Sequence, residues 1–179
     1  QMKRYSVPRI AFINKMDRTG ADPQRVVRDM QEKLGLAVVP IQYPIGEGET
    51  FTGIVDLVTM QALTFGDGDG AAVEQSAVPP AHADAAALAR HQMLEALSMF
   101  DDELMGLLLE DKPVEEAMIR RIIRETTINR EIVPLALGSA FKNKAVQPLL
   151  DAVCAYLPSP LDREYVARDH DNAGAETPL

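Results

Sequence analysis

Two short apolar runs, each followed by a polar loop and an amphipathic helical pattern, constrain the fold of this chain most. The first run covers residues 9–13 and ends at Asn14; the second covers residues 132–137 and ends at Gly138. Short apolar runs bounded by turn residues are typical of strands buried in a parallel sheet. Because strand–loop–helix units are the building blocks of α/β folds, the chain is predicted to contain an α/β sheet.

The helices of both units have recognisable boundaries. In the first unit, Asp22 stands as an N-cap before Pro23 at the first helical position, and Gly35 ends the helix. In the second unit, a helix is expected from Pro148 until Pro158 stops it, and its apolar face includes Cys154. Cys154 is therefore expected in the core, and since it is the only cysteine the chain forms no internal disulfide.

The distance between the two units requires an insertion. Asn14 and Ser139 lie 125 positions apart, whereas one helix and one strand between them need roughly 30 residues. Residues 38–132 carry a net charge of −11 and the flanking residues carry +2. We therefore expect an α/β part at 1–37, an inserted α+β subdomain at 38–132, a second α/β part at 133–161 and a linker or tail at 162–179.

The expected insertion begins with short strands and continues with helices. The strands are expected at 38–43, 51–58 and 61–65, a loop at 66–80, and the helices at 82–100, 101–110 and 113–129. The whole chain carries a net charge of −9, which disfavours a protein that coats nucleic acid. It has no run of 18 apolar residues and no signal segment at its start, so we expect a cytoplasmic protein without a membrane span.

The residues that carry chemistry follow the two predicted strands. In open parallel sheets, ligands bind beyond the carboxyl ends of the strands. There, the carboxylate of Asp17 can accept hydrogen bonds from the ring N–H and the exocyclic amine of guanine, and a site of this kind discriminates by roughly 10⁴–10⁵-fold. Lys15 can lay its aliphatic stem on the base, Asn14 can bridge the two loops, and Ser139–Ala140 can offer a backbone N–H to the 6-oxo group. Taken alone, Asn-Lys-x-Asp also fits an ordinary surface turn.

Three separated regions resemble translational GTPases of the elongation factor G family. Residues 9–22 are similar to the fourth guanine-nucleotide motif, and residues 138–153 with 156–162 are similar to the fifth motif and the final helix. Residues 40–46 and 51–58 resemble the insertion that this family carries in its G domain. The resemblance covers roughly residues 7–162. It implies an incomplete P-loop-GTPase-type parallel sheet, and a guanine site made by Asn14, Lys15, Asp17, Ser139, Ala140 and Phe141.

The family's hydrolytic machinery has no counterpart in this sequence. No G-x-x-x-x-G-K-[ST] phosphate loop occurs in the 179 residues. In the family, that loop, both switch regions and the catalytic histidine all precede the Asn-Lys-x-Asp motif. We therefore expect a fragment that has no catalytic or metal-binding residue and is inactive by itself. The parent protein would bind GTP or GDP, with Mg²⁺ held through residues absent from this chain.

The resemblance also implies a ribosomal partner. The insertion is expected to contact the stalk protein of the large subunit, with Arg120, Arg121 and Arg124 as candidates for meeting an acidic surface. These charges can equally serve only to solvate a helix. The acidic insertion should make little direct RNA contact, and exposed sheet edges should favour self-association. Two alternatives remain: another translational GTPase of the release-factor or ribosome-protection type, and a non-enzymatic module that binds the stalk.

Overall fold

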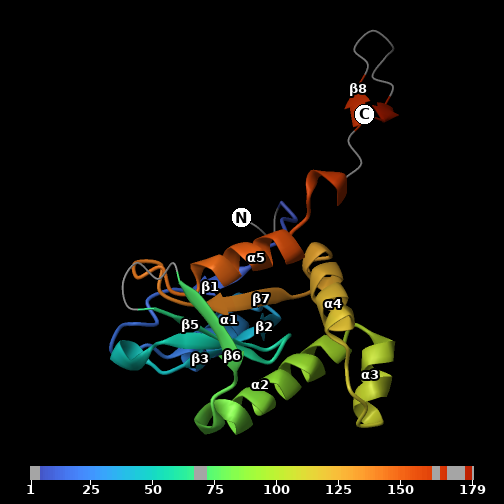
Figure 1. Ribbon diagram of the computed structural model, residues 1–179. Coiled ribbons are helices and arrows are strands. Elements are labelled where there is room, and N and C mark those ends of the chain that lie inside the picture. The colour runs from blue at the N-terminus through green and yellow to red at the C-terminus, as the bar shows by residue number, and fades with distance from the viewer. Residues whose placement is uncertain (1–4, 67–71, 163–165, 169–175, 179) are drawn as a thin grey trace.

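A three-stranded parallel sheet forms the centre of the computed structural model, which describes residues 5–66, 72–162, 166–168 and 176–178. Its strands are β1 (Ala11–Ile13), β7 (Val133–Leu137) and β2 (Val38–Pro40), in the order β1-β7-β2. The central strand, β7, is buried along its whole length, as its continuous apolar sequence predicts. The α/β fold class and the parallel sheet are confirmed (Figure 1).

Strand β2 corrects the expected boundary of the insertion. Val38 pairs in parallel with Val133, so β2 belongs to the central sheet and not to the inserted strands. The parallel sheet therefore extends past residue 37, where the boundary was expected, and continues to Pro40. A run of three apolar residues does not encode which sheet it joins, because that choice depends on pairing with a strand almost a hundred positions away.

The proline inside β7 costs the sheet no hydrogen bond. The Val133 N–H donates to the Ala37 carbonyl (2.8 Å), so the odd-numbered residues of β7 direct their N–H groups toward β2. The nitrogen of Pro134 consequently faces β1, where pairing begins only at Leu135, opposite Ala11. A central strand can therefore tolerate this proline.

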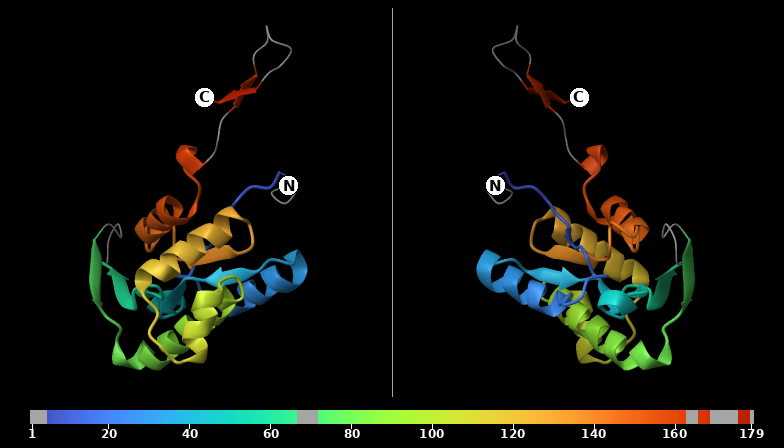
Figure 2. Two further views of the ribbon diagram at one scale, coloured as in Figure 1. Left: turned by 90° about the vertical axis from the view of Figure 1, so that its right-hand side faces the viewer. Right: turned by 90° about the vertical axis from the view of Figure 1, so that its left-hand side faces the viewer.

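Helices cover both faces of the parallel sheet. Figure 2 shows α1 (Pro23–Leu34) and α2 (Pro80–Ser98) on one side and α5 (Val146–Tyr156) on the other. The predicted cap of α1 is present, because Asp22 Oδ1 accepts the Arg25 N–H (2.9 Å) and Gly35 ends the helix with φ +58°. The predicted core face of α5 was wrong, since α5 buries Ala152 and Tyr156 and leaves Cys154 exposed.

The inserted strands form an antiparallel sheet of four strands in the order β3-β4-β5-β6. They are β3 (Gln42–Ile45), β4 (Gly53–Asp56), β5 (Gln61–Phe65) and β6 (Val73–Ala77). Strand β6 lies in the stretch expected to be a loop, and every one of its residues is exposed. Pairing with β5, and not burial, makes this segment a strand, so the hydrophobic pattern gave no sign of it. Residues 67–71 of the expected loop lie outside the described part of the chain.

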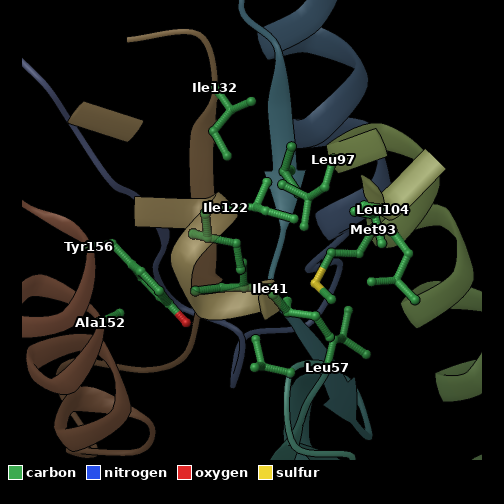
Figure 3. Close-up of a cluster of buried hydrophobic side chains, with 14 residues drawn as sticks. Ile41, Leu57, Met93, Leu97, Leu104, Ile122, Ile132, Ala152 and Tyr156 are labelled. Carbon is green, nitrogen blue, oxygen red and sulfur yellow. The ribbon is translucent and has the colours of Figure 1, made fainter. Parts of the chain in front are cut away.

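Helices α2, α3 (Asp102–Leu109) and α4 (Glu116–Ile128) match the expected helices within a few residues. Asp101 caps α3, since its Oδ1 accepts the Leu104 N–H (2.9 Å). Figure 3 shows the apolar cluster that joins these helices to α5 and to the segments around Ile41 and Leu57. This shared core fixes the insertion against the parallel sheet.

The remaining elements are short. They comprise the 3₁₀ turns η1 (Gly48–Thr50) and η2 (Pro160–Asp162), and the antiparallel strands β8 (Val166–Arg168) and β9 (Glu176–Pro178). The β8–β9 pair lies in the segment that was expected to be a linker or tail. No helix among the described residues is both long and apolar enough to cross a membrane.

Candidate functional site

Two loops meet at the carboxyl ends of β1 and β7. The first loop comprises residues 14–18 and the second comprises residues 138–144. They meet because β1 and β7 are adjacent and parallel. Two backbone hydrogen bonds connect the two segments at this edge. The Gly138 N–H donates to Ile13 O (2.9 Å), and the Met16 N–H donates to Gly138 O (3.0 Å).

Gly138 is required by this close approach. A Cβ atom at this position would lie 2.5 Å from the carbonyl oxygen of Lys144 and 3.0 Å from both the Phe12 ring and the Ala145 side chain. The Lys144 carbonyl belongs to the backbone and the Ala145 side chain is short and buried, so neither can move aside by changing a rotamer. The second loop can therefore fold back against β1 only if residue 138 lacks a side chain.

Asn14 bridges the two loops. Its Oδ1 accepts the N–H of Lys15 (2.7 Å) and, from 126 positions further along the chain, the N–H of Ala140 (3.0 Å). The bridge expected from the sequence is therefore present. It uses the Ala140 N–H, one of the backbone groups of Ser139–Ala140 that were expected to serve the guanine 6-oxo group, so in this structure Asn14 already engages that donor.

Asp17 is held in place by the second loop. Its side chain is only 9% exposed and its carboxylate accepts the Ser139 hydroxyl, while Lys142 Nζ lies 3.6 Å from Oδ2. The Ser139 hydrogen bond lowers the pKa of Asp17 below its ordinary value, and the charges of Lys142 and Arg18 act in the same direction. Asp17 is therefore ionised at neutral pH, and as a carboxylate it can only accept hydrogen bonds.

The remaining predicted site residues are both exposed, Lys15 on the first loop and Phe141 on the second. Lys15 has φ +66°, a left-handed conformation that is uncommon for a residue with a side chain. Phe141 is 93% exposed at the tip of the second loop, and an aromatic side chain so fully in water is unusual. The two loops that hold Asp17 therefore also carry one aliphatic stem and one aromatic ring, which are side chains that suit contact with a flat base.

Lys142 and Ser139 show what reasoning from the sequence missed. The Ser139 hydroxyl accepts the Lys142 N–H (3.4 Å) while it donates to Asp17, so Ser139 orients the carboxylate as well as forming part of its loop. The sequence placed Ser139 at the site only through its backbone and assigned no role to Lys142. The available sign was that Lys142 follows Ser139 by three residues in the same predicted loop.

The three candidate partner-binding arginines all have intramolecular partners. Arg120 pairs with Glu116 (2.7 Å), and Arg121 pairs with Asp101 (3.0 Å) and Glu125 (3.1 Å). Arg124 binds the end of α5 through the Ala155 and Leu157 carbonyls (2.9 and 3.1 Å) and pairs with Asp162 (2.7 Å). Arg121 and Arg124 therefore connect α4 to the start of α3 and to the end of α5, whereas the Arg120 pair lies within α4.

A cavity of about 530 Å³ lies away from the two loops. It is bounded by α1, α2 and the face of the parallel sheet, with Val27, Met93 and Leu135 among its walls. None of the six predicted guanine-site residues lines it. Within the described ranges, no group of three or more His, Cys, Asp or Glu side chains is arranged to hold a metal ion.

Comparison with known proteins finds relatives that cover most of this chain. The family model described as the elongation factor Tu GTP binding domain matches residues 1–159. Elongation factor G of Rhodopirellula baltica is 53% identical over 169 residues, which are 94% of this chain and 24% of that protein. Elongation factor G 2 of Anaeromyxobacter dehalogenans is 47% identical over 171 residues, which are 96% of this chain and 24% of that protein.

A solved structure shows the same fold. A crystal structure of a Thermus thermophilus protein superposes with a TM-score of 0.76 at 27% identity, and covers 92% of this chain and 24% of the other. The chain thus spans about a quarter of the length of the curated relatives that it matches.

Proposed function

This chain belongs to the family of elongation factor Tu GTP binding domains, and from that membership we propose that it carries the guanine-recognition half of a GTP/GDP site. The parent protein is a ribosomal translocation GTPase of the elongation factor G type. The guanine-binding residues are Asn14, Lys15, Asp17, Ser139, Ala140 and Phe141.

One observation carries the proposal: a nearly buried carboxylate stands at the carboxyl edge of a parallel sheet, held by a hydroxyl from the neighbouring loop. The N1–H and the 2-amino group of guanine both donate toward Asp17. Adenine presents no matching pair of donors, so Asp17 would lose its two hydrogen bonds to the base, a loss that a polar site penalises strongly. Lys15 covers one face of the base, and Phe141 reaches it from the second loop.

Release of the Ala140 N–H belongs to the same proposal. That N–H donates to Asn14 Oδ1 and would turn to the 6-oxo group of guanine, while Asn14 keeps its bond to Lys15. Since the sequence has no phosphate loop, the chain holds the base but makes no phosphate-loop contact. It therefore binds nucleotide weakly, with a Kd of about 1 mM or above, and does not hydrolyse it. In the parent protein Mg²⁺ would be held with the phosphates, by residues outside this sequence.

A nucleotide titration of the ¹⁵N-labelled chain tests the proposal. GDP at millimolar concentrations should move the amide signals of residues 14–17 and 139–141, and ADP at equal concentrations should leave them in place. Shifts of equal size with both nucleotides would refute base recognition. Asp29→Asn is the matched control, because Asp29 is an exposed aspartate that pairs with Lys33 on α1, and it should respond to GDP as the wild type does.

The inserted subdomain supports a ribosomal partner in the parent protein. Its net charge of −11 disfavours contact with RNA phosphates and favours contact with protein, for which the stalk protein of the large subunit is the candidate. Because Arg120, Arg121 and Arg124 are engaged within the chain, any contact through them requires these internal pairs to exchange. The parent protein is cytoplasmic in this proposal, and the chain can self-associate through the outer edges of β1 and β2.

A further inference from the structure

We propose that residues 42–51 of the inserted subdomain position both loops of the guanine site, with Gln42 and Lys144 as the positioning residues. The inference rests on the proposed function, because it concerns how that site is held. Three hydrogen bonds and one shared apolar cluster connect this segment to the two loops and to the end of β7.

Gln42 fixes the end of β7 directly before the second loop. Its Oε1 accepts the N–H of Leu137 (3.0 Å), and Gln42 is 6% exposed. β2 ends at Pro40, so Gln42 supplies the acceptor that a longer β2 would have provided to the last residue of β7. A buried N–H that loses such an acceptor is strongly disfavoured. Gly138 and Ser139 follow at once, so the position of Gln42 determines where the second loop begins.

The 3₁₀ turn η1 and the residue after it hold the two loops by backbone groups. Gly48 N–H donates to the carbonyl of Met16 (3.0 Å), the residue between Lys15 and Asp17. On the other loop, Lys144 Nζ donates to the carbonyl of Phe51 (3.1 Å). Lys144 also exchanges two backbone hydrogen bonds with Ser139 (3.0 Å each), so its side chain anchors the turn that carries the Asp17-binding hydroxyl.

A common apolar cluster makes this connection rigid. Met16 and Leu137, from the first loop and the end of β7, pack with Phe51, Ile54 and Phe65 of the inserted sheet, and all five are nearly or fully buried. Because a close-packed interior has low compressibility, a displacement of one of these side chains is passed on to its neighbours. A movement of the inserted sheet therefore moves the backbone at Met16, next to Asp17, and the end of β7, where the second loop begins.

This connection makes the insertion a means of regulating the guanine site. A partner that shifts residues 42–51 changes guanine affinity, and by linkage guanine binding changes the affinity for that partner by the same factor. The partner raises or lowers guanine affinity depending on which arrangement of residues 42–51 it binds more tightly.

Hydrogen exchange in the complete chain tests the positioning role without nucleotide. The amides to follow are Lys15 and Ala140, because both donate to Asn14 Oδ1 across the loops. Gln42→Met and Lys144→Met remove the acceptor and the donor at similar side-chain volume, and Lys144→Arg restores a donor. Arg90→Met is the matched control, since Arg90 binds the Leu57 and Val58 carbonyls wholly within the insertion.

We expect exchange at Ala140 to become about tenfold faster in Gln42→Met and in Lys144→Met, the effect of losing one buried hydrogen bond. It should stay within twofold of wild type in Lys144→Arg and Arg90→Met. The proposal is overturned if either methionine variant stays within twofold of wild type, or if Arg90→Met accelerates exchange equally. A GDP titration of the wild-type chain separates the two proposals: if GDP shifts no loop amide, guanine binding fails, while the exchange rates still decide the positioning role.

Discussion

The hydroxyl of Ser139 should stabilise the folded chain in a way that depends on the ionisation of Asp17. Ser139 is 1% exposed, and its hydroxyl donates to the Asp17 carboxylate. A hydrogen bond to a charged group contributes about 1.5–3 kcal/mol, and one to a neutral group about 0.5–1.5 kcal/mol. At pH 7, Ser139→Ala should therefore lower the free energy of unfolding by about 2 kcal/mol.

Lowering the pH should reduce that difference. The pKa of Asp17 lies below its ordinary value of 3.8 in the folded chain. Its stabilising contribution is therefore fully present above the unfolded pKa, and it is lost as the pH falls through the folded pKa. By pH 3 the effect of Ser139→Ala should be decreasing toward about 1 kcal/mol, the value for a hydrogen bond to a neutral carboxyl.

Urea unfolding of the wild type and the variant between pH 7 and pH 3 measures this effect. Ser98→Ala is the matched control, because Ser98 is also a buried serine but donates to the carbonyl of Glu95 (2.8 Å), which does not titrate. Its effect should be independent of pH. A pH-independent loss in Ser139→Ala, or the same trend in Ser98→Ala, would refute the link between Ser139 and the Asp17 charge.

Three further substitutions test the packing around the site by chemical denaturation. Gly138→Ala places a Cβ 2.5 Å from Lys144 O and should lower the free energy of unfolding by about 2–3 kcal/mol. A change within about 0.5 kcal/mol, the size typical of a surface substitution, would contradict the steric argument. Leu97→Ala removes a fully buried side chain and should cost about 2–5 kcal/mol, and a smaller loss would mean that the core collapses around it. Arg124→Met leaves two carbonyls at the end of α5 without this donor and should lower the free energy of unfolding by about 1–2 kcal/mol. The pKa of Asp162, which hydrogen bonds with Ser159 and Arg124 lower in the wild type, should rise in this variant. An unchanged pKa of Asp162 would exclude its ion pair with Arg124 in solution.

The sequence predicts the α/β fold class and the position of most helices because those signals are local. The N-cap at Asp22 and the helix end at Gly35 each depend on residues within one helical turn, and both are present in the structure. The two loops of the site were also placed together correctly. The reason is that parallel strands bring their carboxyl ends to one edge whatever lies between them in the chain.

Features set by distant contacts were not predictable in the same way. The pairing of β2 with β7, and of β6 with β5, depends on which strand happens to be adjacent. The exposed position of Cys154 depends on which side of α5 meets the core, and several faces of that helix are apolar. The internal partners of Arg124 depend on the course of the chain after Tyr156.

The exchange of base preference in Asp17→Asn tests guanine recognition most directly. Asparagine retains one acceptor and adds an amide donor, so it should match the 2-oxo group of xanthine and no longer match the 2-amino group of guanine. Titrating the ¹⁵N-labelled chain with GDP and with xanthosine diphosphate gives the ratio of the two affinities. The wild type should prefer GDP and Asp17→Asn should prefer xanthosine diphosphate. If GDP remains the preferred ligand of Asp17→Asn, Asp17 does not read the base.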